Sequence, residues 1–153
     1  MKKRGVPAAD ITVAIYKLFT EATHIGRSLY ENNRNVYNLL RYGVHVKTDV
    51  GKVTETVQVI DWDHPEENDF AIAEEVTLTG DHDRRPDLVL YVNGIAIGVI
   101  ELKNSRVSIG DGIRQCLSNQ QPMFHERFFN TVQLIFAGND SEGLKYGSIK
   151  TEE

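Results

Sequence analysis

Apolar residues recur at helical spacing in three stretches of the chain, and the remaining apolar stretches are shorter and read as strands. The helical spacing covers residues 8–24, continues after Ser28 to about residue 41, and returns over 109–122. Ser28 and Glu31 have the form of a capping box, which marks the start of a helix. The pattern therefore predicts two helices near the N-terminus and a third in the second half of the chain.

Alternating or continuously apolar stretches predict strands between and after these helices. The expected strands cover residues 43–48, 53–60, 70–79, 87–92, 95–103 and 131–137. Residues 49–52 and the polar, acidic segment 61–69 are expected to be loops, the latter solvated, and the tail from Gly138 is rich in turn residues. This order predicts an α/β, or α+β, fold in which a mixed central β-sheet is flanked by helices on both faces.

Charged residues interrupt the most apolar part of the predicted sheet. The two strands that flank the turn-forming pair Asn93-Gly94 are apolar at both parities, which is typical of central strands. Yet Asp87 opens the first of these strands, and Glu101 and Lys103 lie near the end of the second, on one shared face. A carboxylate buried there without a partner is costly. These groups must therefore be paired, exposed at the sheet end, or bound to a metal.

The face on which Asp87 lies depends on how the two strands pair. A two-residue turn pairs Val92 with Ile95, and this register places Asp87 opposite Ile100, on the face away from Glu101. One β-bulge or a three-residue connection would bring Asp87 opposite Glu101. We therefore expect an irregularity between these strands, or an Asp87 side chain that turns inward from the strand end.

The same three charged groups have the composition of a site for phosphodiester hydrolysis. The carboxylates of Asp87 and Glu101 with the backbone carbonyl of Leu102 would form an all-oxygen ligand set, which suits Mg²⁺ or Mn²⁺ in its place. Such an ion lowers the pKa of a bound water. Lys103 would stand beside the attacking water as a hydrogen-bond donor. A salt-bridged cluster at the end of the sheet is the structural alternative.

The surrounding sequence adds a family resemblance to this reading. Asp87, Glu101 and Lys103 form a PD-(D/E)xK motif, and the stretches NDFAIAEEVTLTG and RPDLVLYVNGIAIGVIELKNS resemble the N-terminal nuclease domain of the R (motor) subunit of type I restriction endonucleases. The resemblance implies one domain over residues 1–153 with a restriction-endonuclease-like core. It also implies a type I site-specific deoxyribonuclease that cleaves double-stranded DNA with Mg²⁺ and leaves a 5′-phosphate.

The resemblance further implies methylase (M) and specificity (S) subunits as partners and ATP-driven translocation in the intact complex. This sequence has no G-x-x-x-x-G-K motif, because Val46 stands where a glycine is needed ahead of Gly51 and Lys52. We therefore expect the chain to be an excised nuclease module, and ATP to act only through a motor domain outside it.

One further site residue follows from the same family. Its members carry a Gln, with an aromatic residue four positions later, on the helix after the Glu-x-Lys residues. Here Gln115 is carried over as a supporting catalytic residue, while Asn119 departs from the pattern. Both are expected on one helical face, apart from a core stripe formed by Ile113, Cys116 and Leu117.

Charge and cysteine content limit the classes of protein that remain. The formal net charge of −5 argues against a free-standing nucleic-acid binder, so partner subunits would have to grip the DNA. The single cysteine, Cys116, and the absence of a long apolar stretch favour a cytoplasmic protein without a membrane span. Glu21 or Glu31 could add a carboxylate to the site, and their spacing favours neither.

Two alternative functions stay open from the sequence. The chain could be a non-catalytic docking module of the same complex, or a different PD-(D/E)xK DNA nuclease such as a structure-specific one. Loss of metal binding in Asp87→Ala and loss of cleavage in Lys103→Ala would favour catalysis by these residues.

Overall fold

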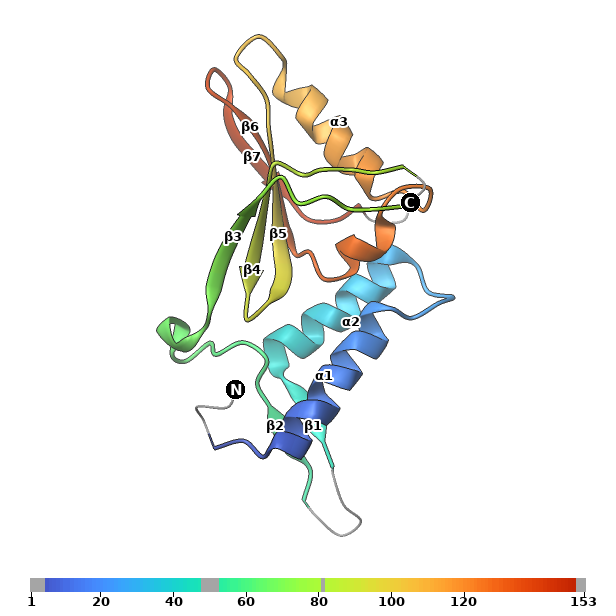
Figure 1. The fold of residues 1–153 in the computed structure, drawn as a ribbon, viewed down its shortest axis with the longest axis vertical. Coiled ribbons are helices and arrows are strands. Elements are labelled where there is room, and N and C mark those ends of the chain that lie inside the picture. Colours follow the sequence, from blue (N-terminus) through green and yellow to red (C-terminus); the bar gives the residue numbers. More distant parts are fainter. Residues whose placement is uncertain (1–4, 48–52, 81, 151–153) are drawn as a thin grey trace.

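The computed structural model describes residues 5–47, 53–80 and 82–150 and contains both helices and sheets (Figure 1). The helices are α1 (Ala8–Ala22), α2 (Leu29–Tyr42) and α3 (Ile109–Asn119), with short 3₁₀ helices η2 (Pro65–Glu67) and η3 (Glu126–Asn130). The strands are β1 (Val44–Val46), β2 (Glu55–Val57), β3 (Phe70–Glu74), β4 (Leu88–Val92), β5 (Ile95–Leu102), β6 (Leu134–Asn139) and β7 (Gly143–Gly147).

The strands form a five-stranded mixed sheet and a separate two-stranded ribbon. The large sheet has the order β3-β4-β5-β6-β7, in which only β5 and β6 pair in parallel, and β1 pairs with β2. Parallel pairing of β5 with β6 requires a crossover connection, and α3 supplies it. The predicted mixed α/β architecture with a central mixed sheet is thereby confirmed.

Most of the predicted elements are present, with shorter bounds. The strand expected at 70–79 ends at Glu74, and the one expected at 131–137 runs instead from Leu134 to Asn139. The connection expected at 49–52 lies outside the described residues. The sequence predicts no strand after residue 137, and this is wrong because residues 143–147 form β7, antiparallel to β6. Only three residues lie between the two glycines of β7, too few to show a clear alternation.

The capping box at the start of α2 is confirmed by reciprocal hydrogen bonds. The Ser28 hydroxyl accepts from the backbone N–H of Glu31 at 3.3 Å, and the Glu31 carboxylate accepts from the backbone N–H of Ser28 at 3.1 Å. The bond from this backbone N–H is the main reason that the pKa of Glu31 lies below its usual value. The Glu31 carboxylate is therefore used to hold the start of α2.

The two faces of the large sheet differ in how they are covered. α3 packs on one face, where Val99, Cys116 and Ile135 belong to one buried core. A second core joins α1, α2 and the β1–β2 ribbon and reaches the sheet near the β4–β5 turn. The predicted helical cover of both faces is therefore incomplete. The other face leaves apolar side chains exposed, namely Phe70, Ile72, Leu134, Leu144 and Tyr146.

The expected irregularity between the two central strands is a β-bulge. Val92 pairs with Ile95 across a two-residue turn at Asn93 and Gly94, which both have positive φ angles, of 52° and 80°. Farther along, Tyr91 pairs with Ala96 but Leu90 pairs with Gly98, so one residue of β5 has no partner on β4. The register beyond the bulge is the one that brings Asp87 opposite Glu101.

Candidate active site

The bulge places the two predicted carboxylates on the same face of the sheet. Leu88 pairs with Ile100, and one residue further Asp87 comes opposite Glu101. The Asp87 carboxylate reaches across to β5, where its Oδ2 accepts a hydrogen bond from the backbone N–H of Leu102 at 2.6 Å. The backbone of Asp87 is held as well, because its carbonyl accepts from the N–H of Glu75 at 2.9 Å.

Glu101, Lys103 and Gln115 lie together, as the sequence predicted. The Nζ of Lys103 donates to Glu101 Oε1 at 2.8 Å and to Gln115 Oε1 at 2.7 Å. Glu101 is only 2% exposed, whereas the Lys103 side chain is 20% exposed and reaches the surface. The site therefore combines a buried carboxylate with an amine that two acceptors hold in place.

One oxygen of the buried carboxylate is left without a partner in the part of the chain that the structure describes. Glu101 Oε2 is buried and accepts no hydrogen bond among the described residues. Burial is the main cause that raises the pKa of Glu101, the nearby charge of Asp87 raises it further, and the hydrogen bond from Lys103 opposes both. An unpaired buried carboxylate oxygen is costly, so the arrangement indicates a site with a ligand to receive.

Close packing of α3 on the sheet fixes Lys103. A Cβ atom added at Gly112 would lie 3.3 Å from the Cβ of Ala137 and 3.5 Å from the Cγ of Lys103. Gly112 is three residues before Gln115, so both face the lysine from the same side of α3. Gly112 is not among the site residues predicted from the sequence. A glycine inside a helix, three residues before Gln115, is nevertheless a signal that another segment packs closely there.

The expected core stripe of α3 is wrong for two of its three residues. The buried residues of α3 are Ile109, Gly112, Cys116 and Asn119, whereas Ile113 and Leu117 are exposed. Asn119 is only 1% exposed and lies on the buried side of the helix, next to Cys116, so it does not occupy an open face with Gln115. Gln115 alone carries over to the site. Cys116 is buried, as expected for a small apolar side chain.

Glu21 and Glu31 make no contact with the Asp87–Glu101 pair. Glu21 accepts hydrogen bonds from Arg27 and from the Asn35 amide, and Glu31 serves the capping box. Both sets of contacts are local to α1, α2 and the turn between them. Neither glutamate is therefore assigned to the site.

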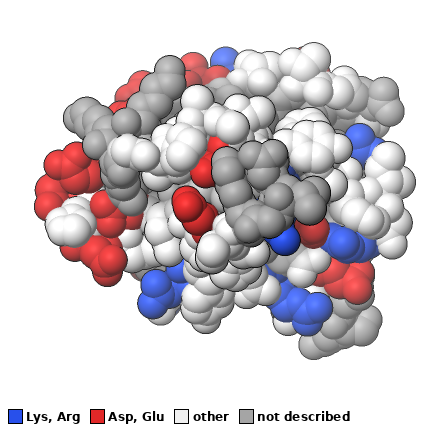
Figure 2. Space-filling model, turned by 90° about the horizontal axis from the view of Figure 1, so that it is seen from below, with Lys and Arg blue, Asp and Glu red and all other residues white. Residues whose placement is uncertain are grey.

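Acidic side chains also gather away from the site. Figure 2, which views the molecule from below, shows them at the left edge, and the segment at 61–69 is rich in exposed carboxylates. The expectation that this segment is solvated is wrong in part, because Asp61 and Asn68 are buried, at 7% and 9% exposure. The net charge is thus not concentrated on the candidate site.

The oxygens at the site fit a hard divalent cation. Asp87 Oδ1 and Glu101 Oε2 have no hydrogen-bond partner among the described residues. No cluster of three or more His, Cys, Asp or Glu side chains suited to a metal occurs in the described part of the chain. Mg²⁺ is usually held by one or two carboxylates together with waters and substrate. The donor set of Asp87 and Glu101 therefore suits that ion.

Two relatives from Methanocaldococcus jannaschii share part of this sequence. Both are named as endonuclease subunits of type I restriction enzymes, MjaVIIIP and MjaIXP. The first is 27% identical over 113 residues, which is 70% of this chain and 11% of the relative. The second is 27% identical over 103 residues, which is 63% of this chain and 10% of the relative. The chain thus spans only a small part of the length of the relatives.

In the described residues, no helix has the length and apolar content that crossing a membrane would require.

The family comparison covers almost every residue. The family model described as the type I restriction enzyme R protein N terminus matches residues 2–153. This chain belongs to the family of type I restriction enzyme R protein N-terminal regions.

Proposed function

We propose that this chain is a Mg²⁺-dependent nuclease module that cleaves double-stranded DNA within a type I restriction enzyme. The observation that carries the proposal is the buried Oε2 of Glu101, which has no hydrogen-bond partner among the described residues and belongs to a side chain opposite Asp87 and bonded to Lys103. The β-bulge disrupts the pairing of β4 with β5 and brings Asp87 to the face that Glu101 and Lys103 share. The two relatives, both named as endonuclease subunits, support the same activity.

Each site residue has a distinct role in this proposal. Asp87 and Glu101, with the backbone carbonyl of Leu102, would hold Mg²⁺. When bound, the ion would supply positive charge for the scissile phosphate and lower the pKa of a coordinated water. The bond from the Leu102 N–H orients the Asp87 carboxylate, and burial orients that of Glu101. Together they keep two oxygen donors at fixed positions before a ligand arrives.

Lys103 is placed to donate to a water or to a phosphate oxygen. Its Nζ has three protons, of which two are engaged by Glu101 and Gln115. The third proton is available for the reacting group. Gln115 is a neutral acceptor, so it orients the amine without neutralising its charge. We therefore assign Gln115 as a positioning residue and Lys103 as the catalytic one.

Direct hydrolysis by water fits the side chains present. The site joins carboxylates, an amine and an amide, and the only thiol in the chain, Cys116, is buried with its pKa raised to about 11. A thiol of that pKa is a poor nucleophile near neutral pH. Water would therefore attack the phosphorus, and the family resemblance implies that the 3′-oxygen leaves, so that cleavage gives a 5′-phosphate.

The acidic chain needs partners to hold DNA firmly. Its formal net charge is −5, and electrostatic attraction supplies most non-specific affinity for DNA. We propose that methylase and specificity subunits, and an ATP-driven motor in the same assembly, provide that grip. The nuclease module would then need to contact only the phosphates next to its two carboxylates.

The test measures ion binding and DNA cleavage separately. Calorimetric titration of the chain with Mg²⁺ should show millimolar binding that is lost in Asp87→Asn and kept in Asp83→Asn, a carboxylate in the preceding loop. Plasmid DNA incubated with the chain and Mg²⁺ should be cut, and Lys103→Met should reduce the rate by at least about a hundredfold. Lys47→Met, an exposed lysine on another part of the surface, is the matched control.

The outcomes separate the alternatives. Absence of Mg²⁺ binding at about ten millimolar would contradict the proposal and favour a non-catalytic docking module. Ion binding that needs Asp87, without cleavage by the chain alone, would require the assay to be repeated in the assembled complex, where Lys103→Met must still abolish cutting. Preferential cutting of branched over linear DNA would instead indicate a structure-specific nuclease.

A further inference from the structure

β7 is an edge strand whose outer side has no partner among the described residues. It pairs with β6 on one side only, and all five of its residues are exposed. The backbone N–H and C=O groups of an edge strand that point away from its neighbour can pair with another strand. Leu144 and Tyr146 are 58% and 79% exposed, which is unusual for apolar residues of a sheet.

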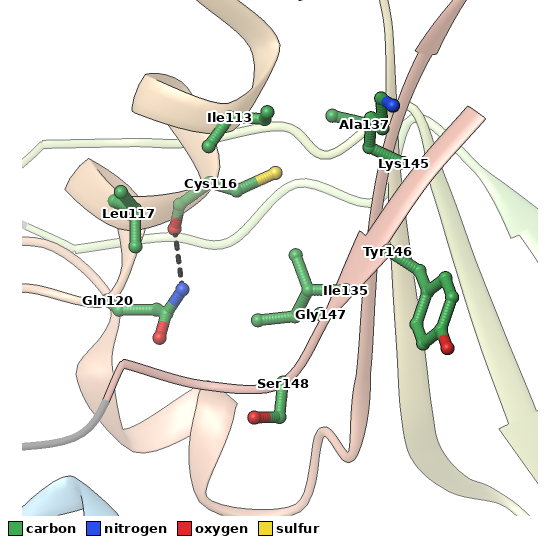
Figure 3. Close-up of a pocket in the computed structure, with 10 residues that line it drawn as sticks. All are labelled: Ile113, Cys116, Leu117, Gln120, Ile135, Ala137, Lys145, Tyr146, Gly147 and Ser148. Atoms are coloured by element: carbon green, nitrogen blue, oxygen red, sulfur yellow. Dashed lines mark hydrogen bonds between the residues drawn. The ribbon is translucent and has the colours of Figure 1, made fainter. Parts of the chain in front are cut away.

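Apolar surface lies on both sides of this edge. On the open face of the sheet, the Tyr146 ring lies 6.2 Å from the ring of Phe136, and Leu144 lies over Gly138. On the opposite face, a cavity of about 220 Å³ separates α3 from β7 (Figure 3). Ile113 and Leu117 of α3 line that cavity, and Figure 3 shows the Tyr146 ring on the far side of β7 from α3.

Lys145 places a positive charge on this edge strand. It lies between Leu144 and Tyr146 and faces the opposite side of the sheet, as alternate residues of a strand do. Lys145 forms no ion pair and donates no hydrogen bond among the described residues, and it lines the cavity beside α3. A residue on an added strand directly opposite Lys145 would therefore be favoured if it carried a carboxylate.

We propose that β7 binds an extended segment of a partner protein, which adds a sixth strand to the sheet. The segment would place apolar residues beside Leu144 and Tyr146 and an Asp or Glu opposite Lys145. Main-chain hydrogen bonds would supply affinity, and the alternation of apolar and acidic side chains would supply specificity. This inference does not depend on DNA cleavage, since none of these residues belongs to the candidate active site.

A second copy of the chain fits this edge less well. Lys145 is the central residue of the five in β7. Antiparallel pairing of two β7 strands about that centre would put the two Lys145 side chains directly opposite each other, and like charges in that position are destabilising. A lysine on an exposed edge is a common means of preventing self-association. The charge therefore favours an acidic partner strand.

The test uses a synthetic peptide with the required alternation. The probe is a fluorescein-labelled peptide, Thr-Val-Thr-Ile-Glu-Ile-Thr-Val-Thr, and its counterpart has Lys in place of the central Glu. Fluorescence anisotropy should show that the Glu peptide binds the chain, and that Lys145→Glu weakens this binding roughly threefold to fivefold. The Lys peptide should recover that loss on Lys145→Glu. Lys150→Glu, the same charge change outside β7, should leave the preference unaltered.

Hydrogen exchange locates the binding and completes the test. Amides of residues 143–147 should become protected when the Glu peptide is present, and Tyr146→Thr should reduce that protection. Absence of protection at millimolar peptide, or equal weakening by Lys145→Glu and Lys150→Glu, would overturn the proposal. So would sedimentation showing that the chain dimerises through β7 without peptide. Mg²⁺ binding by Lys145→Glu should match that of the unaltered chain, which keeps this test separate from that of the nuclease activity.

Discussion

Two of the buried acidic residues in the described part of the chain, Asp61 and Glu101, have very different surroundings. Asp61 Oδ1 accepts from the backbone N–H groups of Asp63 and His64 at 3.1 and 3.0 Å. Its second oxygen lies 3.6 Å from the His64 ring. Glu101 accepts one bond from Lys103, its other oxygen has no partner among the described residues, and the Asp87 charge faces it. One carboxylate is bonded within its own loop, and the other leaves an acceptor unused.

We propose that the difference separates an acid that supports the fold from one that serves the candidate site. Bonds from local backbone groups let Asp61 shape the loop that it begins, and such bonds stabilise a carboxylate without a ligand. Glu101 is buried and lies near the carboxylate of Asp87, and both conditions oppose its charged form. The hydrogen bond from Lys103 is the contact that offsets part of this cost. The Asp61 loop therefore supports the fold, whereas the surroundings of Glu101 agree with the proposal that it receives a cation.

The loop begun by Asp61 is tied to the turn of the central hairpin through Asn68. The Asn68 amide donates to the carbonyls of Asp61 and Pro65 at 2.8 and 2.9 Å. Its oxygen accepts from the Asp61 N–H at 2.8 Å and from the Asn93 side chain at 2.9 Å. Asn93 also donates to the carbonyl of Val59 at 2.8 Å. This network connects the loop to β4 and β5, on which the site is built.

The largest expected effect is the loss of stability in Asn68→Ala. The variant removes four hydrogen bonds and leaves partly buried backbone groups without partners, so the free energy of unfolding should fall by about 3 kcal/mol. Urea denaturation followed by circular dichroism measures this fall. Glu67→Gln, an exposed residue of the same loop, is the control and should change stability by less than about 0.5 kcal/mol. A fall below about 1 kcal/mol for Asn68→Ala would show that water replaces the network.

The spatial grouping of Asp87, Glu101 and Lys103 was easier to predict from the sequence than this support. Glu101 and Lys103 are two residues apart, and period two alone places them on one face. For Asp87 to join them, the sequence required an irregular pairing of the two strands or an Asp87 side chain that turns inward, and the structure has a β-bulge. The hydrogen bond between the side chains of Asn68 and Asn93 joins residues 25 positions apart, and no periodicity in the sequence predicts it. β7 was missed because its apolar residues are few and lie on the exposed face.

A smaller effect is expected from Glu101→Gln, and it depends on pH. Burial raises the pKa of Glu101, so the folded chain binds this proton more tightly than the unfolded chain. The resulting stabilisation is fully present below the usual value of 4.5 and is lost as pH rises through the raised pKa. Gln carries no such proton. The free energy of unfolding of Glu101→Gln, minus that of the unaltered chain, should therefore increase as pH rises.

Urea denaturation at a series of pH values measures that difference. Mg²⁺ at about ten times its dissociation constant should stabilise the unaltered chain by roughly 1.4 kcal/mol and reduce the difference at neutral pH. Glu67→Gln is again the matched control, since an exposed glutamate should give a difference that stays flat with pH. A flat difference for Glu101→Gln would mean that this carboxylate is not held in a protonated state by the fold, and that the contrast with Asp61 is weaker than the contacts indicate.

The smallest expected effect is at Cys116, which lies close enough to the site to report its charge. Burial is the main cause that raises the pKa of this thiol to about 11, the charges of Glu101 and Asp87 add to the rise, and Lys103 opposes it. Iodoacetamide near pH 8 should therefore modify Cys116 far more slowly than it modifies the unfolded chain. Glu101→Gln removes one negative charge, so the labelling rate should rise by about twofold to threefold. Asp63→Asn, in the loop begun by Asp61, should leave the rate unchanged.

Equal rates in the unaltered chain and Glu101→Gln would show that no negative charge resides on Glu101 at this pH, and that Lys103 has no carboxylate partner in the free site.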